Sequence, residues 1–101
     1  MIPVMPMTAL GEGQMMACTV AGQELLIANV DGQYYALSNL CSHAGQRLSL
    51  GRLRGHELSC PLHRAAFDIR TGAPLSAPAT ESLKRYPVTL AGGKVNVTLP
   101  G

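Results

Sequence analysis

Two short pairs of metal-ligand residues define the chemistry open to this sequence. Cys41 and His43 have one residue between them, and Cys60 and His63 have two. Each pair offers one thiolate and one imidazole. A [2Fe–2S] cluster can be held by two Cys on one iron and two His on the other. Because each iron needs two protein ligands, two loops with one Cys and one His each can straddle such a cluster. The spacing therefore predicts an electron carrier with these four residues as ligands.

Structural zinc is the alternative for this ligand set, since two Cys and two His also form a zinc site. Zinc fingers usually keep Cys with Cys and His with His. Here both pairs are mixed, and the first has a single intervening residue. The pattern favours iron–sulfur over zinc. A zinc-binding interaction module remains the alternative from another class of protein.

The residues around the two pairs resemble the Rieske ferredoxin family. The resemblance covers most of the chain and rests on Cys41-Ser42-His43-Ala44-Gly45, Leu48, Gly51, Gly55, Cys60-Pro61-Leu62-His63, Phe67-Asp68 and Thr71-Gly72. It is strongest to the small ferredoxins of bacterial ring-hydroxylating dioxygenase systems. It implies a one-electron carrier, not an enzyme, that takes electrons from a flavin-containing, NAD(P)H-dependent reductase and passes them to a terminal aromatic-ring oxygenase. A small subunit of a nitrite reductase is the other role that the motif allows.

Several positions depart from the patterns of related proteins. Arg64 follows the second ligand His, where the family usually has Gly. High-potential Rieske proteins have an extra Cys in each loop, and here the matching residues are Gln46 and Leu62. They also place hydroxyl groups where Ala65 and Phe67 stand. Hydrogen bonds to the sulfurs help to set the reduction potential. We therefore expect a potential at the low end of the Rieske range.

Short apolar runs alternate with turn signals, which indicates an all-β domain. Ala21-Gly22, Asp31-Gly32 and Gly92-Gly93 are the expected tight turns. We expect a Rieske-like antiparallel β-sandwich framework in a single domain of residues 1–101, with a small inserted cluster-binding β subdomain at residues 39–71. The expected strands are residues 2–5, 14–20, 23–30, 33–38, 57–60, 66–69, 83–90 and 94–99.

Composition excludes several classes of protein. The formal charge of +2 is too small to imply nucleic-acid binding. Three cysteines argue against a secreted disulfide scaffold, and the third, Cys18, is expected to pack as a small hydrophobe. The sequence has no signal peptide pattern and no apolar stretch of membrane-spanning length. We therefore expect a soluble, cytoplasmic, monomeric protein with no membrane contact.

Charge and apolar side chains near the ligand pairs suggest further roles. Five arginines lie in or beside the two loops, and in that stretch only Glu57 and Asp68 offset them: Arg47, Arg52, Arg54, Arg64 and Arg70. They form either a solvated face or a surface that steers acidic redox partners. The apolar cover of the cluster is expected from Leu48, Leu50, Leu62 and Phe67. We expect His56, the third histidine, to be an exposed turn residue.

Overall fold

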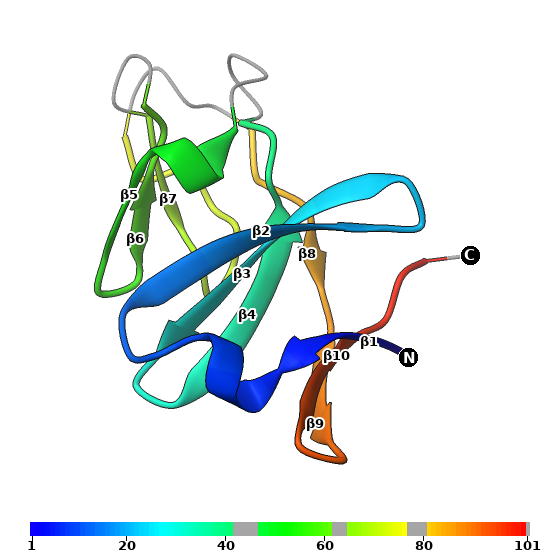
Figure 1. Cartoon of the computed structure of the whole chain (residues 1–101). Coiled ribbons are helices and arrows are strands. Elements are labelled where there is room, and N and C mark those ends of the chain that lie inside the picture. The colour runs from blue at the N-terminus through cyan, green and yellow to red at the C-terminus, as the bar shows by residue number, and fades with distance from the viewer. Residues whose placement is uncertain (42–46, 62–64, 77–80, 101) are drawn as a thin grey trace.

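Three antiparallel sheets make up the computed structural model, which describes residues 1–41, 47–61, 65–76 and 81–100 (Figure 1). The first sheet has the order β1 (Ile2–Pro6), β10 (Lys94–Val97), β9 (Val88–Ala91). The second has the order β2 (Gln14–Val20), β3 (Gln23–Val30), β4 (Gln33–Ser38), β8 (Arg85–Tyr86). The third has the order β5 (Arg52–Arg54), β6 (Glu57–Ser59), β7 (Ala66–Asp68). Two short 3-10 helices, η1 (Met7–Ala9) and η2 (Leu48–Leu50), complete the described elements, and none of these is a helix long and apolar enough to cross a membrane.

The second sheet forms through tight hairpins whose turn residues have positive φ. Ala21 and Gly22 join β2 to β3 with φ values of 51° and 80°. Asp31 and Gly32 join β3 to β4 with φ values of 54° and 76°. Two successive residues with positive φ make the turn whose twist matches that of the flanking strands. These two predicted turns are confirmed, and β2, β3 and β4 have the predicted bounds.

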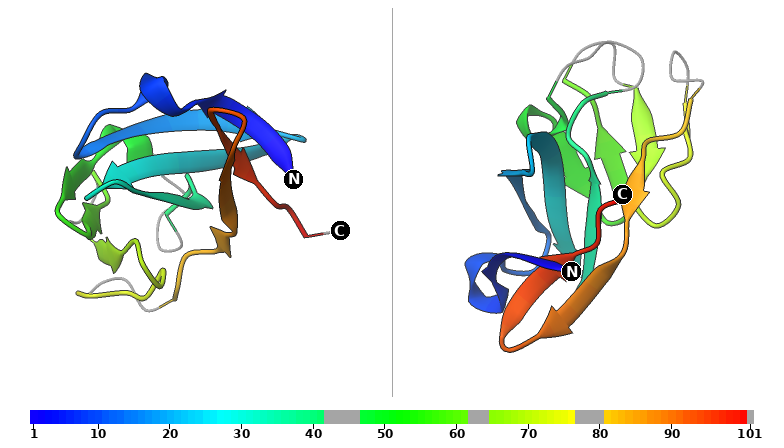
Figure 2. Two further views of the ribbon diagram at one scale, coloured as in Figure 1. Left: turned by 90° about the horizontal axis from the view of Figure 1, so that it is seen from below. Right: turned by 90° about the vertical axis from the view of Figure 1, so that its right-hand side faces the viewer.

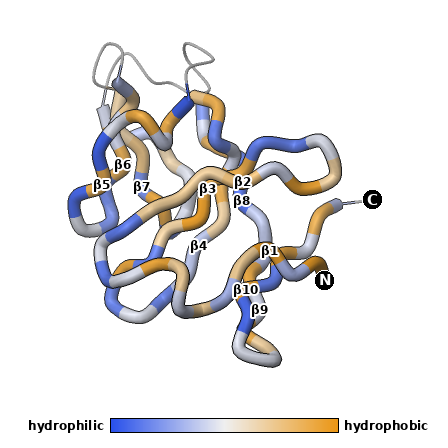
Figure 3. The backbone as a smooth tube through the Cα atoms, viewed as in Figure 1, coloured by the Kyte–Doolittle hydropathy of each residue, from blue (hydrophilic) through white to orange (hydrophobic). Residues whose placement is uncertain are grey.

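β3 is the central strand of the molecule, because both of its faces are buried. Leu26, Ala28 and Val30 contribute to one buried cluster, which also contains residues of the third sheet. Leu25 and Ile27 point to the opposite face and pack in a second cluster with residues of the first sheet. Successive side chains of a strand alternate between its faces, so an unbroken apolar run serves two cores. The apolar stretch of β3 stands out in Figure 3.

This arrangement stacks the small third sheet on one side of the β2–β4 sheet and the first sheet on the other (Figure 2). The expected all-β, Rieske-like fold is confirmed. One strand prediction is wrong, because residues 83–90 do not form a single strand. Pro87, which has no N–H to donate, separates β8 from β9. As a result β8 pairs with β4, whereas β9 pairs with β10 in another sheet. The short strand β5 was not predicted.

Candidate metal centre

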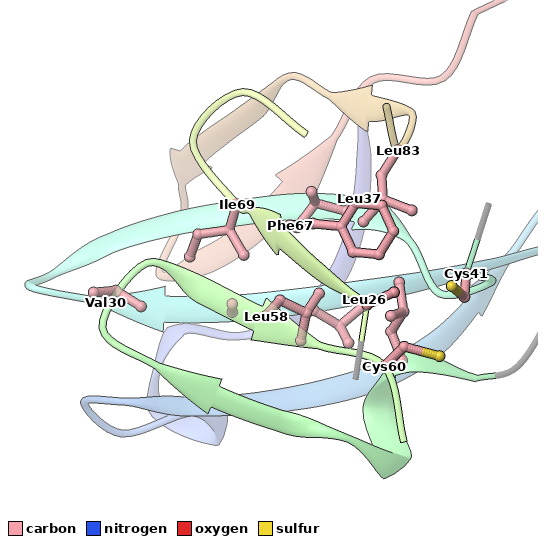
Figure 4. Close-up of a cluster of buried hydrophobic side chains, with 12 residues drawn as sticks. Leu26, Val30, Leu37, Cys41, Leu58, Cys60, Phe67, Ile69 and Leu83 are labelled. Atoms are coloured by element: carbon pink, nitrogen blue, oxygen red, sulfur yellow. The ribbon is translucent and has the colours of Figure 1, made fainter. Parts of the chain in front are cut away.

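The two ligand cysteines lie in the same buried cluster, although they come from different loops. Cys41 follows β4 and Cys60 follows β6, and each is 3% exposed. Their side chains lie at the same end of this cluster, opposite Val30 (Figure 4). The structure therefore brings together the two predicted thiol ligands. His43 and His63 lie outside the described residues.

Cys18, the third cysteine, lies on β2 and packs against the second buried cluster. It packs there half-buried, and burial raises the pKa of its thiol. A raised pKa keeps a thiol protonated and inert. This placement confirms the prediction that Cys18 packs as a small hydrophobe.

The loop that carries Cys41 is closed at its base by Asn39. The Leu48 N–H donates to the Asn39 backbone oxygen at 2.7 Å, and the Ser49 N–H donates to Asn39 Oδ1 at 2.9 Å. Leu40 and Arg47 form an isolated antiparallel bridge just above these bonds. Asn39 is fully buried, so its hydrogen bonds are shielded from water. The two ends of the first ligand loop are thereby fixed to each other.

The same loop base is fixed to the framework through Glu24 of β3. The Asn39 N–H donates to the Glu24 backbone oxygen at 3.0 Å. The Arg47 guanidinium donates to Glu24 Oε1 at 2.9 Å, and this hydrogen bond raises the pKa of Arg47. The ion pair is solvent-exposed, so its contribution to stability is small. For the site, this means that the positive charge of Arg47 is offset by Glu24, which is distant in the sequence.

The second ligand loop is closed by a backbone hydrogen bond within the third sheet. The Cys60 N–H donates to the Ala65 oxygen at 2.7 Å, directly beyond the paired residues Ser59 and Ala66. Gly51 also lies very close to the strand that leads into this loop. A Cβ atom at Gly51 would lie 1.8 Å from the Ser59 backbone oxygen. Gly51 is therefore required for packing against β6, and its own φ of −88° is ordinary.

A third segment runs beside β7. The Leu75 N–H donates to the Ala66 oxygen at 2.7 Å, and Pro74 bridges to Phe67. It leads toward residues 77–80. The resemblance to Rieske ferredoxins implies that residues 75–79 cover a third side of the cluster, and residues 77–79 lie outside the described residues.

Asp68 organises the turn after β7. Its carboxylate accepts hydrogen bonds from the Arg70 backbone N–H at 2.9 Å and from Arg70 Nη2 at 2.9 Å. The side-chain hydrogen bond from Arg70 is the main cause that lowers the pKa of Asp68. Like Arg47, Arg70 is thus neutralised by an acidic residue. Asp68 therefore has a structural role in this turn.

The apolar surroundings of the thiols match the prediction in part. Leu48 and Phe67 are fully buried in the cluster that contains both cysteines. Leu50 is 68% exposed, so the prediction that it covers the site is wrong. Residues of a 3-10 helix repeat every three positions, so Leu48 and Leu50 of η2 point in different directions. Leu62 lies outside the described residues.

His56 is in the predicted turn, between β5 and β6, but it is not fully exposed. Its ring packs edge-on against Tyr35, with 6.1 Å between the ring centroids. The contact explains its partial burial, and sequence reasoning missed it because Tyr35 lies on a distant strand.

The described half of the ligand set fits one iron of a [2Fe–2S] cluster. Two sulfur donors reach one buried end of the core from two loops, and each loop is closed at its base by backbone hydrogen bonds. Thiolates are the ligands that iron–sulfur clusters use. Apolar burial of the sulfurs also limits the access of water.

Comparison with known proteins agrees with this chemistry. A family model described as the Rieske [2Fe-2S] domain matches residues 1–87. The chain is similar to the ferredoxin component of the naphthalene 1,2-dioxygenase system of Pseudomonas aeruginosa, with 46% identity over 87% of this chain and 85% of the relative. Among solved structures, it is similar to the ferredoxin of carbazole 1,9a-dioxygenase from Nocardioides aromaticivorans IC177, with a TM-score of 0.91, 36% identity and coverage of 95% and 94% of the two chains. A complex of reduced oxygenase and oxidized ferredoxin in carbazole 1,9a-dioxygenase contains a chain that matches with a TM-score of 0.90, 32% identity and coverage of 95% and 90%.

Proposed function

Because this chain belongs to the Rieske [2Fe–2S] family and carries a [2Fe–2S] cluster, we propose that Cys41 and Cys60 bind one iron and that His43 and His63 bind the other. The common burial of the two thiols at one end of the core is the observation that supports this assignment. With sulfur at the buried end, the two imidazoles would hold the outward iron. Residues 39–71 would act as the cluster-binding subdomain of a single domain of residues 1–101.

The chain is a ferredoxin, an electron-transfer component of the kind found in ring-hydroxylating dioxygenase systems. We propose that its electron acceptor is a terminal aromatic-ring oxygenase and that its donor is a flavin-containing reductase. The ferredoxin–oxygenase complex among its structural relatives supports the acceptor. We further propose that it works as a monomer in the cytoplasm, where reduced thiols are available for cluster assembly.

When bound, the cluster accepts and releases one electron. The residues of the chain control how this happens. Leu48 and Phe67 keep water from the sulfurs, while the hydrogen bonds at Asn39 and Cys60 hold the bases of both ligand loops. A rigid site limits the rearrangement that accompanies a change of charge. The outward imidazoles would form the edge through which electrons enter and leave.

Visible and EPR spectra of the anaerobically purified protein test this assignment. We expect a red-brown protein with the low-g EPR signal of a Rieske cluster, and we expect His43→Ser and His63→Ser to lose it. Cys18→Ser and His56→Gln are matched controls, since they replace the one cysteine and the one histidine that are not proposed ligands. Both variants should retain the full signal. A colourless protein with one bound zinc, or unaltered spectra in the His43 and His63 variants, would refute the assignment.

A further inference from the structure

A groove of about 730 Å³ lies on the outer face of the third sheet, beside the second ligand loop. Strands β5 and β6 supply much of its lining, and Cys60 and Pro61 lie at its border. Among the described residues, Cys41 is not part of the lining, so the groove runs beside the pair of cysteines and not between them. The lining residues are Leu50, Gly51, Arg52, Arg54, Glu57, Ser59, Cys60, Pro61, Ala66 and Ser76.

Strand alternation places the charged side chains in this groove. Leu53 and Leu58 point inward and pack against the buried cluster that contains the cysteines. Their neighbours on β5 and β6 must then point outward. Arg52 and Arg54 accordingly lie on the same outer face, and both are exposed. The groove is therefore lined by two guanidinium groups from one short strand.

The register of β5 and β6 leaves the positive charge uneven. Arg54 lies opposite Glu57, the one acidic residue among the described lining residues. Arg52 lies opposite Ser59, which is neutral and directly precedes Cys60. The positive charge that Glu57 does not offset is thus nearest to the ligand cysteine. The sequence alone could not single out Arg52, because it does not show which of the five arginines in this region has an acidic neighbour.

Two of those five arginines are engaged elsewhere, and Arg64 lies outside the described residues. Arg47 pairs with Glu24 and Arg70 pairs with Asp68, both at 2.9 Å. Exposed leucine side chains lie near the remaining described arginines, Arg52 and Arg54. Leu50 is on the groove and 68% exposed, and Leu40, which directly precedes Cys41, is 43% exposed. Arginine is enriched at protein–protein interfaces, and the buried core of such interfaces is apolar.

We propose that this groove is the docking surface for a carboxylate-rich segment of a redox partner, with Arg52 as its main electrostatic contact. This proposal rests on the proposed electron-carrier function and names the chemistry of the partner surface. A guanidinium binds carboxylates through two parallel hydrogen bonds, which gives orientation as well as attraction. Leu50 adds an apolar contact at the same groove. Docking here brings the partner alongside Cys60.

Calorimetric titration of the cluster-loaded protein with a short synthetic peptide of alternating glutamate and leucine tests the proposal. We expect weak binding at low salt that is lost at high salt, and no binding of the matching lysine–leucine peptide. Arg52→Gln and Arg54→Gln should each weaken binding by about two- to fivefold, as expected for exposed charge pairs. Arg52→Gln should have the larger effect.

Two further variants separate this groove from an effect of overall charge. Lys94→Gln removes one positive charge from the remote strand β10, and it should leave binding unchanged. Glu57→Gln removes the carboxylate from the groove and should strengthen binding, which a variant that merely damages the fold would not do. The proposed docking surface is refuted if cluster-loaded protein with normal spectra does not bind the glutamate–leucine peptide. It is also refuted if Lys94→Gln weakens binding as much as Arg52→Gln. The carrier function would survive either result.

Discussion

Asn39 and Cys60 show how single residues hold the ligand loops. Asn39 uses its backbone N–H, its backbone oxygen and its side-chain oxygen to join β3, η2 and the loop that carries Cys41. Cys60 uses its N–H to close the second loop onto Ala65. Buried hydrogen bonds of this kind are costly to break, because the groups left behind have no water. These bonds therefore help to fix the positions of Cys41 and Cys60.

Ala65 and Phe67 provide a prediction about the reduction potential. Both are fully buried, and neither can offer a hydroxyl group to a cluster sulfur. We expect a midpoint reduction potential toward the low end of the Rieske range, about −150 mV. Ala65→Ser and Phe67→Tyr should raise it, because a hydrogen bond to sulfur stabilises the reduced, more negative cluster.

Redox titration monitored by visible absorbance measures this effect. Val88→Thr adds a hydroxyl group on β9, in another sheet, and should leave the midpoint unchanged. A wild-type midpoint well above zero would contradict the prediction, as would an equal shift in all three variants.

Among the glycines of the described residues, Gly51 leaves the least room for a side chain, because it lies directly against β6. Gly51→Ala would place a methyl group 1.8 Å from the Ser59 backbone oxygen, so β5 or β6 must move. Overpacking of this type costs about 1–3 kcal/mol. We expect a lower melting temperature and faster loss of the cluster, since Ser59 directly precedes Cys60. Thermal unfolding followed at the visible band of the cluster would show both.

Gly11→Ala is the matched control for this substitution. A Cβ atom at Gly11 would meet only the flexible side chain of Gln14, at 3.2 Å. That variant should unfold close to the wild-type temperature. Equal losses in the two variants would mean that the approach of Gly51 to β6 has no special importance.

The turn after β7 makes stability depend on pH through Asp68. Hydrogen bonds from Arg70 lower the pKa of Asp68 in the folded protein relative to the unfolded chain, whose value is about 3.9. The stabilisation is therefore fully present above the unfolded pKa and is lost as pH falls through the lower folded pKa. Asp68→Asn should destabilise the protein at neutral pH, and the difference from wild type should shrink in acid.

Urea unfolding of both proteins by circular dichroism, from neutral pH down to about pH 2, measures this difference. The variant should differ from wild type by a constant amount until the lower end of the range. A difference that grows on acidification would contradict a stabilising role of the ion pair between Asp68 and Arg70.

At the scale of the whole molecule, charge is distributed unevenly between the two ends. Glu12 and Asp31 lie together beyond the end of β3, where the Asp31 N–H donates to Glu12 Oε2 at 2.8 Å. Val30, their neighbour, is at the end of the core opposite Cys41 and Cys60 (Figure 4). Arg52 lies near the ligand end. Two carboxylates thus lie away from the ligand cysteines, the exposed Arg52 lies on the groove beside Cys60, and the chain carries a formal charge of +2.

This distribution predicts how the reduced protein reacts with small oxidants. The rate with the hexacyanoferrate(III) anion should fall as salt is added, because salt weakens its attraction to the positively charged protein. The screening length falls from about 30 Å at 0.01 M salt to about 10 Å at 0.1 M. The rate with the hexaammineruthenium(III) cation should rise. Stopped-flow absorbance measures both rates, and equal, salt-independent behaviour with the two ions would argue against electrostatic steering.

Local features were predictable from sequence because they depend on neighbouring residues. The mixed Cys–His pairs indicated the cofactor, and the dipeptides Ala21-Gly22 and Asp31-Gly32 identified hairpins that the structure confirms. Apolar runs identified β3 as a strand for the same reason, since side-chain alternation is a property of one strand. The role of His43 and His63 stays a prediction from the motif.

Tertiary structure decided the features that depend on residues far apart in the chain. It paired Arg47 with Glu24, exposed Leu50, packed Gly51 against Ser59 and divided one expected strand at Pro87. Spacing along a chain does not reveal which strands will meet or which charge will find a partner across a sheet. The ligand set is thus a property of the sequence, whereas the surface offered to a redox partner arises only when the sheets assemble.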